Sequence, residues 1–429
     1  MAFLTYFNVA IFVIITLFYA YQMVYLLVAL VFEKKKNHFE DDAKQMHRFA
    51  CLISARNESA VIGNLIKSIK NQNYPEDLVD VIVVADNCTD NTADIARECG
   101  AIVYERFNME QVGKGYALDY LFDRITEDFG SVREYDGYFV FDADNVLDKN
   151  YIREMNKVFD SGYNVLTSYR NSKNYGSNWI TAGYALWFLR EAKFLNNPRM
   201  ILNTNCAVSG TGFLVNSKVI EGQDGWKYHL LTEDIEFSIA NAIKGERIGY
   251  CEKAVLYDEQ PETFKQSWNQ RMRWAKGFYQ VFGKYSKSLV SNMFKSKHKF
   301  TSCYDMLMTI CPSTMLSLLC VVVNVSYISY GIADPEMMPV LVPIIINAVV
   351  FSITNCALTM YAMGLITTIT EWNKIRTTTA KKILYTFTFP VFMATYIPIA
   401  VAALVKKVEW KPISHNVVMT AEEIQNSIN

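Results

Sequence analysis

The sequence predicts an α/β fold, with a largely parallel, doubly wound sheet placed between hydrophobic membrane segments. Three observations predict it. The first 32 residues carry no charged side chain, and three more uncharged stretches lie near the other end of the chain. Between them, short runs rich in Val, Ile and Phe alternate with segments of helical periodicity. Strands that alternate with helices are typical of parallel sheets covered by helices.

Residues 1–32 predict a retained transmembrane helix. At about 1.5 Å per residue, this stretch is longer than a hydrocarbon core of roughly 30 Å. A cleaved signal peptide would begin with basic residues and have a shorter apolar run. Here the basic residues Lys34, Lys35 and Lys36 come afterwards. Because basic residues favour the cytosolic side, we expect the chain that follows to be cytosolic.

Three uncharged C-terminal stretches predict further membrane segments. They span residues 306–332, 337–370 and 383–405. Four simple crossings would leave Lys406 and Lys407 outside the cell, against the charge rule. Either the second stretch forms more than one helix, or one segment is interfacial or re-entrant. Pro390 and Pro398 favour a broken or surface-lying element in the last stretch, and we expect a cytosolic C-terminus.

The middle of the chain predicts the sheet. Runs typical of buried strands lie at residues 50–54, 79–86, 101–105 and 137–144. After the first run, one helical face collects Val61, Ile62, Leu65, Ile66 and Ile69 within residues 59–72. Residues 91–99 predict a second, shorter helix. This β-α-β-α-β order is the basis for the parallel sheet.

Composition excludes several classes of protein. The net charge of −1 argues against a polycation that binds nucleic acid. The nine cysteines contain no CxxC pair, which argues against a zinc site. Scattered thiols in a chain of 429 residues are also unlike a small disulfide scaffold. They fit a reducing, cytosolic compartment for the middle of the chain.

Carboxylates follow two of the predicted strands. Asp142 and Asp144 end one strand, and in an extended chain their side chains point to the same side. Such a pair can hold Mg²⁺ or Mn²⁺ against a diphosphate, although a simple turn would also suit these residues. Asp86 ends another strand, where it could bind a nucleotide or form an Asx turn and helix N-cap.

Three further motifs carry candidate chemistry. Lys114 lies between two glycines and could approach a phosphate or a base, or lie in a surface turn. Asp234 follows Thr232 and Glu233, where it could act as a general base or belong to an ordinary helix start. In an aromatic, basic segment, Arg273 could neutralise a diphosphate. Trp274 offers a flat face for a sugar, or an anchor at the membrane surface.

In this order, the motifs resemble those of processive family 2 glycosyltransferases, the group of cellulose, hyaluronan, chitin and poly-N-acetylglucosamine synthases. The series runs from Asp86 through Lys114, the Asp142-Ala143-Asp144 pair and Thr232-Glu233-Asp234 to Gln270-x-x-Arg273-Trp274. Residues 260–264, Gln-Pro-Glu-Thr-Phe, also look like the cellulose synthase pattern. The resemblance covers about residues 50–290, and it implies a GT-A catalytic domain and an inverting, single-displacement reaction.

The resemblance implies a role for each residue. Asp234 would be the catalytic base, and Asp144 with Asp142 would hold the metal ion. Residues implied to bind the nucleotide sugar are Arg56, Asn57, Glu58, Asp86, Lys114, Asp142 and Arg273. Residues implied to bind the acceptor are Gly210, Thr211, Glu233, Gln270 and Trp274.

The C-terminal residues 410–415 resemble a short aromatic gating segment of hyaluronan-type synthases. Trp410 and His415 are its candidate gating residues. The match departs from the family pattern, because Ile413, Ser414 and His415 occupy the region where threonine and arginine are usual. If the resemblance holds, this segment returns to the active site. The sequence shows no cyclic-dinucleotide-binding domain, so such control would come from a separate subunit.

The combined prediction is a multi-pass plasma-membrane enzyme with a cytosolic catalytic domain. Its partners would be a UDP-sugar donor, a glycan acceptor, the lipid bilayer and regulatory or export subunits, with Mg²⁺ or Mn²⁺ as cofactor. The predicted segments are 1–32, 33–263, 264–302, 303–405 and 406–429, in the order membrane helix, GT-A domain, interface helices, membrane helices and tail. A non-processive enzyme with a lipid acceptor is the alternative, and an inactive membrane scaffold is a remote one.

Overall fold

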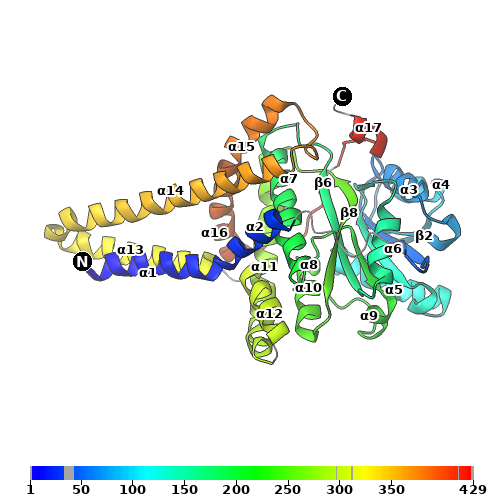
Figure 1. Cartoon of the computed structure of the whole chain (residues 1–429), viewed down its shortest axis with the longest axis horizontal. Helices are drawn as coiled ribbons and strands as arrows, with labels where there is room; N and C mark the ends of the chain where they lie inside the picture. The colour runs from blue at the N-terminus through cyan, green and yellow to red at the C-terminus, as the bar shows by residue number, and fades with distance from the viewer. Residues whose placement is uncertain (1, 33–42, 296, 311–312, 414, 427–429) are drawn as a thin grey trace.

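The computed structural model describes residues 2–32, 43–295, 297–310, 313–413 and 415–426. An α/β domain forms one end of the molecule and long helices extend from it (Figure 1). Lys34, Lys35, Lys36 and Ser414, which the sequence singled out, lie outside the described residues.

One eight-stranded sheet forms the centre of the α/β domain, in the order β3-β2-β1-β4-β7-β6-β8-β5. The strands are β1 (Phe49–Ala55), β2 (Val79–Asp86), β3 (Ile102–Arg106), β4 (Gly137–Asp142), β5 (Val146–Leu147), β6 (Val165–Ser172), β7 (Phe213–Asn216) and β8 (Ile248–Asp258). β3, β2, β1 and β4 are parallel, as the sequence predicts. β7 runs antiparallel to both of its neighbours, β4 and β6. β6 and β8 are again parallel, whereas β5 pairs antiparallel with β8. The sheet is therefore largely parallel, as predicted, but mixed in its second half.

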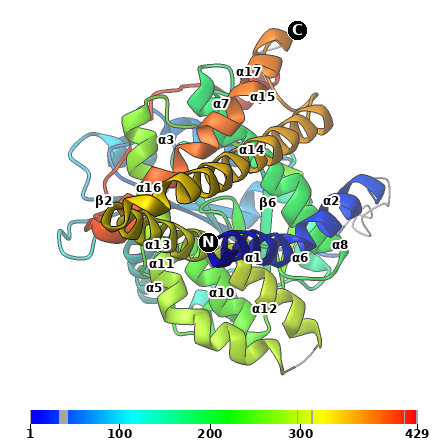
Figure 2. The same cartoon turned by 90° about the vertical axis from the view of Figure 1, so that its left-hand side faces the viewer.

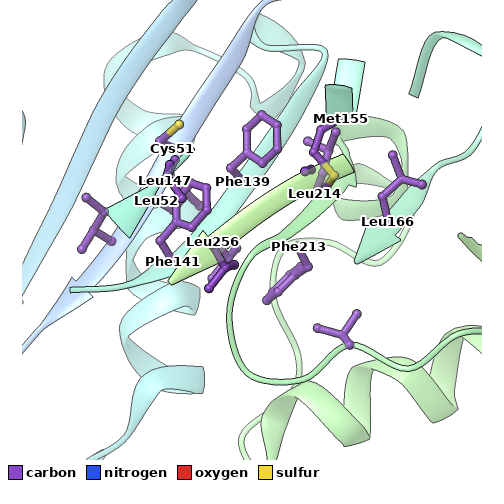
Figure 3. Close-up of a cluster of buried hydrophobic side chains, with 14 of the residues drawn as sticks. Cys51, Leu52, Phe139, Phe141, Leu147, Met155, Leu166, Phe213, Leu214 and Leu256 are labelled. Carbon is purple, nitrogen blue, oxygen red and sulfur yellow. The ribbon is translucent and has the colours of Figure 1, made fainter. Parts of the chain in front are cut away.

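Helices cover the first half of the sheet because each has one apolar face. They are α3 (Ile62–Lys70), α4 (Thr92–Glu98), α5 (Lys114–Phe129) and α6 (Tyr151–Asp160). Figure 3 shows the core, in which Phe139 and Phe141 of β4 lie near Leu214 of β7. These side chains are fully buried, so the sheet forms a rigid platform for the loops at its edge.

The second half of the domain carries longer helices. α7 (Trp179–Glu191) continues through a π-helical turn (Ala192–Asn196) into α8 (Asn197–Ile201). Then come α9 (Ser217–Glu221), α10 (Glu233–Lys244), α11 (Phe264–Met293) and α12 (Lys297–Ile310). Capping boxes begin α7 at Asn178 and α11 at Thr263. Short 3₁₀ turns occur at Glu76–Leu78, Val132–Glu134 and Pro335–Met337.

Four stretches of the described chain are long and apolar enough to cross a membrane. They are Ala2–Val31, Leu316–Ala333, Pro335–Thr370 and Thr379–Val405. Their helices are α1 (Ala2–Tyr19), α2 (Tyr21–Val31), α13 (Ser313–Ala333), α14 (Met338–Thr370), α15 (Thr379–Ala394) and α16 (Tyr396–Val405). α1, α13 and α14 extend away from the sheet (Figures 1 and 2). Many of their large apolar side chains are exposed, as a lipid environment would require.

The last of these stretches is broken and lies against the catalytic domain, as its prolines predict. Phe392 of α15 packs so closely on Gly183 of α7 that a Cβ there would meet its ring at 2.3 Å. Arg271 of α11 donates to the carbonyl oxygen of Phe392 over 3.1 Å. Tyr279 of α11 donates to the carbonyl oxygen of Ala400 over 3.1 Å. The chain therefore leaves α16 beside the catalytic domain.

Two tyrosines of the first candidate membrane segment bond to a buried ion pair at the catalytic domain. Arg199 of α8 donates to both carboxylate oxygens of Asp305 in α12, over 2.7 and 2.8 Å. Tyr21 and Tyr25 of α2 donate to the same carboxylate, over 3.0 and 2.8 Å. Asp305 is thus satisfied from two elements, and the end of the N-terminal helix is fixed against the domain.

Candidate active site

The candidate residues gather at the carboxyl ends of β1, β2 and β4, where ligands of open α/β sheets bind. Asp86 ends β2 and Asp142 ends β4, on either side of β1. Loops from the second half of the domain and the C-terminal tail meet at the same edge. The structure therefore brings together residues that are more than 300 positions apart in the sequence.

Asp86 forms a buried ion pair at the outer part of this edge. Its Oδ1 accepts a hydrogen bond of 2.6 Å from Nη1 of Arg106, at the end of β3. Burial raises the pKa of Asp86, and Arg106 opposes that shift. Asn87 follows with a φ of 53°, which turns the chain sharply after the strand. Asp86 is therefore held in place by Arg106, which lies outside the sequence motif that contains Asp86.

The loop after β1 carries the next candidates. Asn57, at a φ of 57°, accepts the Thr89 N–H over 2.7 Å, and this bond ties it to the loop after β2. The Glu58 N–H donates to Thr92 Oγ1 over 2.8 Å. The Arg56 guanidinium lies 5.4 Å from the ring centre of Trp410 in the tail. These side chains line the same edge as Asp86.

Lys114 lies between Asp142 and the loop that follows α8. Its Nζ donates to Asp142 Oδ1 and, over 2.8 Å, to the carbonyl oxygen of Gly210. Gly115 is required beside it, because a Cβ there would lie 2.1 Å from the Tyr228 carbonyl oxygen. The glycine beside the lysine thus reflects close backbone packing rather than a surface turn.

Asp144 is almost fully buried, with 4% of its surface exposed. Its Oδ2 accepts the Glu259 N–H over 2.7 Å. Burial alone would raise the pKa of Asp144, but His415, Lys173 and Arg170 together hold it below the usual value. The carboxylate is therefore kept ionised, as a metal ligand must be.

The loop that contains Gly210 and Thr211 lies against the Asp142 turn. The Asp142 N–H donates to Thr211 Oγ1 over 2.9 Å, and the Thr211 hydroxyl donates to Asn145. Gly210 has a φ of 76°, and a Cβ there would lie 3.7 Å from Asp234 Oδ2. The loop thus lies between the Asp142 carboxylate at the end of β4 and the Asp234 carboxylate of α10.

Asp234 and Glu233 begin α10, where backbone N–H groups point toward them. Glu233 is buried, whereas Asp234 keeps part of its surface exposed. Burial raises the pKa of Asp234, and the Ile235 N–H, Arg273 and Lys114 oppose the shift. Arg273 donates to the Leu231 carbonyl oxygen over 3.0 Å, which holds it beside this helix start. A carboxylate with a raised pKa is a stronger proton acceptor than a free one.

Trp274 belongs to an aromatic cluster between α11 and α7. Its ring centre lies 5.7 Å from that of Tyr184 and 6.2 Å from that of Phe188. Gln270, one turn earlier on α11, has a buried Oε1 with no hydrogen bond among the described residues. Trp274 is held by α7 packing, whereas the anchor interpretation would leave it at the lipid surface.

The C-terminal tail crosses the carboxyl edge of the sheet. His415 Nδ1 lies 3.0 Å from both Glu58 carboxylate oxygens. The N–H groups of Asn416 and Val417 approach the Glu259 carboxylate within 3.1 Å. Burial would lower the pKa of His415, but Asp144, Glu58 and Glu259 raise it to about 10. The tail therefore returns to the site, as the resemblance implied.

The residues fit a divalent ion only together with a diphosphate. Among the described residues, no group of three or more His, Cys, Asp and Glu side chains is placed to hold a metal. Asp142 and Asp144 supply two carboxylates, and Mg²⁺ is commonly bound by one or two carboxylates plus substrate phosphates. The remaining ligands would come from the nucleotide sugar and water.

Sequence reasoning missed several charged residues. Arg170 of β6 pairs with Asp258 at the end of β8 and donates to the Ser209 carbonyl oxygen over 2.9 Å. Burial raises the pKa of Asp258 to about 6, against the pull of Arg170. These residues belong to no motif of the series. Only the position of Asp258 at the end of a strand could have pointed to it.

A family model described as glycosyltransferase like family 2 matches residues 47–277. The chain belongs to this family. The match covers the sheet, α10 and the first half of α11, and so contains the candidate site apart from the C-terminal tail.

Curated relatives agree with the family. The chain is 28% identical over 291 residues to a probable glycosyltransferase, YdaM, of Bacillus subtilis, with 63% of each chain covered. It is 26% identical to a beta-monoglucosyldiacylglycerol synthase of Synechocystis, over 54% of this chain and 48% of that one. It is 25% identical to a poly-beta-1,6-N-acetyl-D-glucosamine synthase of Staphylococcus epidermidis, over 56% and 57%. The chain spans less than two thirds of each relative's length.

A solved structure shows the same fold. The mannosyltransferase PcManGT from Pyrobaculum calidifontis, in complex with GDP-Man and Mn²⁺, superposes with a TM-score of 0.55 at 16% identity. The likeness covers 94% of this chain and 99% of that chain. The α/β domain is thus a GT-A-like domain with a mixed sheet, and four candidate transmembrane segments flank it.

Proposed function

We propose that this protein is a membrane-embedded, inverting glycosyltransferase that moves a sugar from a UDP-sugar onto the end of a growing β-linked glycan. The observation that carries the proposal is the position of Asp234. Its carboxylate faces Gly210 and lies within the electrostatic influence of Lys114 and Arg273. A base beside two cations suits a reaction in which a hydroxyl loses a proton while a diphosphate leaves.

The proposed reaction is a single displacement. The acceptor hydroxyl oxygen attacks the anomeric carbon of the donor, Asp234 takes the hydroxyl proton, and UDP leaves with the bonding electrons of the anomeric C–O bond. Lys114 and Arg273 stabilise the leaving diphosphate. Mg²⁺ or Mn²⁺ at Asp142 and Asp144 would supply further positive charge there.

The remaining residues are proposed to hold the two substrates. Asp86, with Arg56, Asn57 and Glu58, would bind the nucleoside part of the donor at the outer edge of the sheet. Gly210, Thr211, Glu233, Gln270 and Trp274 would line the acceptor side. We propose UDP-glucose as the first donor to test, which would give a β-glucan, and UDP-N-acetylglucosamine as the second.

The membrane segments support a product that leaves through the bilayer. We propose a plasma-membrane protein with residues 33–263 in the cytosol and residues 264–302 at the membrane surface. Residues 1–32 and 303–405 would hold or pass the glycan, and the tail, residues 406–429, would gate the donor site. Separate regulatory or export subunits would complete the assembly.

A lipid acceptor is the second candidate. It is favoured by the relative named as a beta-monoglucosyldiacylglycerol synthase, whose match of 237 residues is nearly as long as the 249-residue match of the polymer synthase. Both candidates use the same donor chemistry and differ only in the acceptor.

Product size separates the two candidates. The full chain in proteoliposomes is incubated with radiolabelled UDP-glucose or UDP-N-acetylglucosamine, and the products are sized and their linkages determined. We expect a polymer. A glycolipid with one sugar would replace the polymer with the lipid acceptor, and no transfer from any UDP-sugar would overturn the proposed function.

A further inference from the structure

Glu191 is a carboxylate on the acceptor side that no motif of the series contains. It ends α7, immediately before the π-helical turn Ala192–Asn196. Single π-helical turns inside α-helices occur frequently at functional sites, because they change the direction of nearby side chains. Glu191 is half-buried, and within the described chain its carboxylate makes no hydrogen bond or ion pair. A half-buried carboxylate in this state is available to a ligand.

The position of Glu191 continues the aromatic cluster around Trp274. Tyr184, Phe188 and Glu191 are spaced by four and three residues, so they lie on one face of α7. Tyr184 and Phe188 are the two residues of α7 whose rings meet Trp274. The helix therefore presents, in order, two aromatic rings beside Trp274 and then a carboxylate.

Several charged groups, including Asp234, act on the Glu191 carboxylate. Burial raises the pKa of Glu191. The positive charges of Arg199, Arg170 and Arg190 oppose this shift, and the negative charge of Asp234 adds to it. Arg170 lies over the Phe188 ring, with its central carbon 3.7 Å from the ring centre. Glu191 thus follows the Trp274 cluster along one face of α7 and lies within the electrostatic influence of Asp234.

We propose that Glu191 binds the terminal sugar of the acceptor through two neighbouring hydroxyl groups. An ionised carboxylate only accepts hydrogen bonds, and its two oxygens match two adjacent hydroxyl donors. A diacylglycerol offers one hydroxyl, which Asp234 would already take. Glu191 therefore selects an acceptor that ends in a sugar, whether that sugar belongs to a glycan or to a glycolipid. This inference rests on the proposed sugar transfer.

The test separates transfer to a sugar from reaction with water. Purified full chain is assayed with UDP-glucose and with UDP-N-acetylglucosamine, using octyl β-D-glucoside or dioctanoylglycerol as acceptor, and donor hydrolysis is measured without acceptor. For Glu191→Gln we expect kcat/KM for octyl glucoside to fall at least about tenfold, mainly through KM, because a hydrogen bond to a charged group is lost. Donor hydrolysis should stay within about twofold.

Two further variants make the result specific. Glu154→Gln removes another half-buried carboxylate, which pairs with Lys157 in α6 away from Trp274, and should match the wild type. Glu191→Asp keeps the charge on a shorter side chain and should fall between wild type and Glu191→Gln. If Glu191→Gln fails to fold, Glu191→Asp alone must raise KM for octyl glucoside at unchanged hydrolysis.

Three outcomes would overturn the inference. They are unchanged transfer in Glu191→Gln, equal loss of transfer and hydrolysis, and a shifted pH profile of hydrolysis, which would mean that Glu191 acts through Asp234. Wild-type protein that neither hydrolyses nor transfers either donor would instead overturn the proposed function.

Discussion

The two sides of the site treat their charged groups differently. On the proposed donor side, three carboxylates are already paired within the chain: Asp86 with Arg106, Asp142 with Lys114, and Glu58 with His415. On the acceptor side, the described residues leave the Glu191 carboxylate and the Gln270 Oε1 without partners. Under the proposed function, a charged donor would join or replace existing ion pairs, whereas a neutral, hydroxyl-rich acceptor would meet polar groups that have no partner in the described chain.

The largest effect should come from the residue where the two sides meet. Asp234→Asn removes the proton acceptor but keeps its size, so transfer should fall by about 10²–10⁴-fold while UDP binding stays largely intact. Turnover measurements test the loss of transfer, and equilibrium binding of UDP tests whether the nucleotide is still bound. Glu221→Gln, which changes an exposed carboxylate at the end of α9, is the control. Near-normal turnover in Asp234→Asn would refute the assigned role.

The pH profile tests the same carboxylate without a mutation. Burial raises the pKa of Asp234, and the proposed reaction needs its ionised form. Activity should therefore be lost as the pH falls through this raised pKa, at a pH above the ordinary aspartate value of about 3.9. Values of kcat across the acid pH range measure this loss of activity. An acid limb at or below the ordinary value would contradict the environment described for Asp234.

The donor side should lose stability when one of its pairs is broken. Arg106→Met leaves Asp86 as a buried, unpaired charge, which costs about 3–5 kcal/mol of unfolding free energy. Thermal unfolding of the purified chain measures the loss. Arg97→Met, which breaks the exposed pair with Glu105, should cost less than about 1 kcal/mol. Equal unfolding temperatures for the two variants would show that burial of the pair does not matter.

The acceptor side should separate transfer from hydrolysis. Trp274→Ala removes the ring that meets Tyr184 and Phe188, so acceptor use should fall about tenfold more than donor hydrolysis. Rates with and without an added acceptor measure the ratio. Trp268→Ala, whose ring instead packs on Phe264, is the matched control. A parallel decrease of both rates would count against an acceptor role.

The smallest effect should come from the tail. His415→Ala removes the contact with Glu58, so KM for the donor should rise a few-fold while kcat changes little. Lys411→Ala, at an exposed tail position, is the control and should leave both constants unchanged. An unchanged donor KM in His415→Ala would remove the tail from the donor side.

The donor half of the fold was predictable because its signals are local. The apolar runs that end at Asp86 and Asp142 match β2 and β4 closely, and the helical face of residues 59–72 matches α3. The mixed order of the second half was not predictable, because β7 is only four residues long and its direction depends on long-range pairing. Within the site, motif residues could be proposed in advance. Arg170 and Glu191 could not be proposed, because their roles depend on which elements of the fold pack together.

The position at which α16 ends affects how often the tail occupies the site. His415 lies ten positions after Val405 at the end of α16, so the tail is a tether with a reach of at most about 35 Å. A segment held on so short a tether experiences its target at an effective concentration in the millimolar range. Even a weak contact with Glu58 is then occupied most of the time. A free peptide of the same sequence would have to approach that concentration to compete with it.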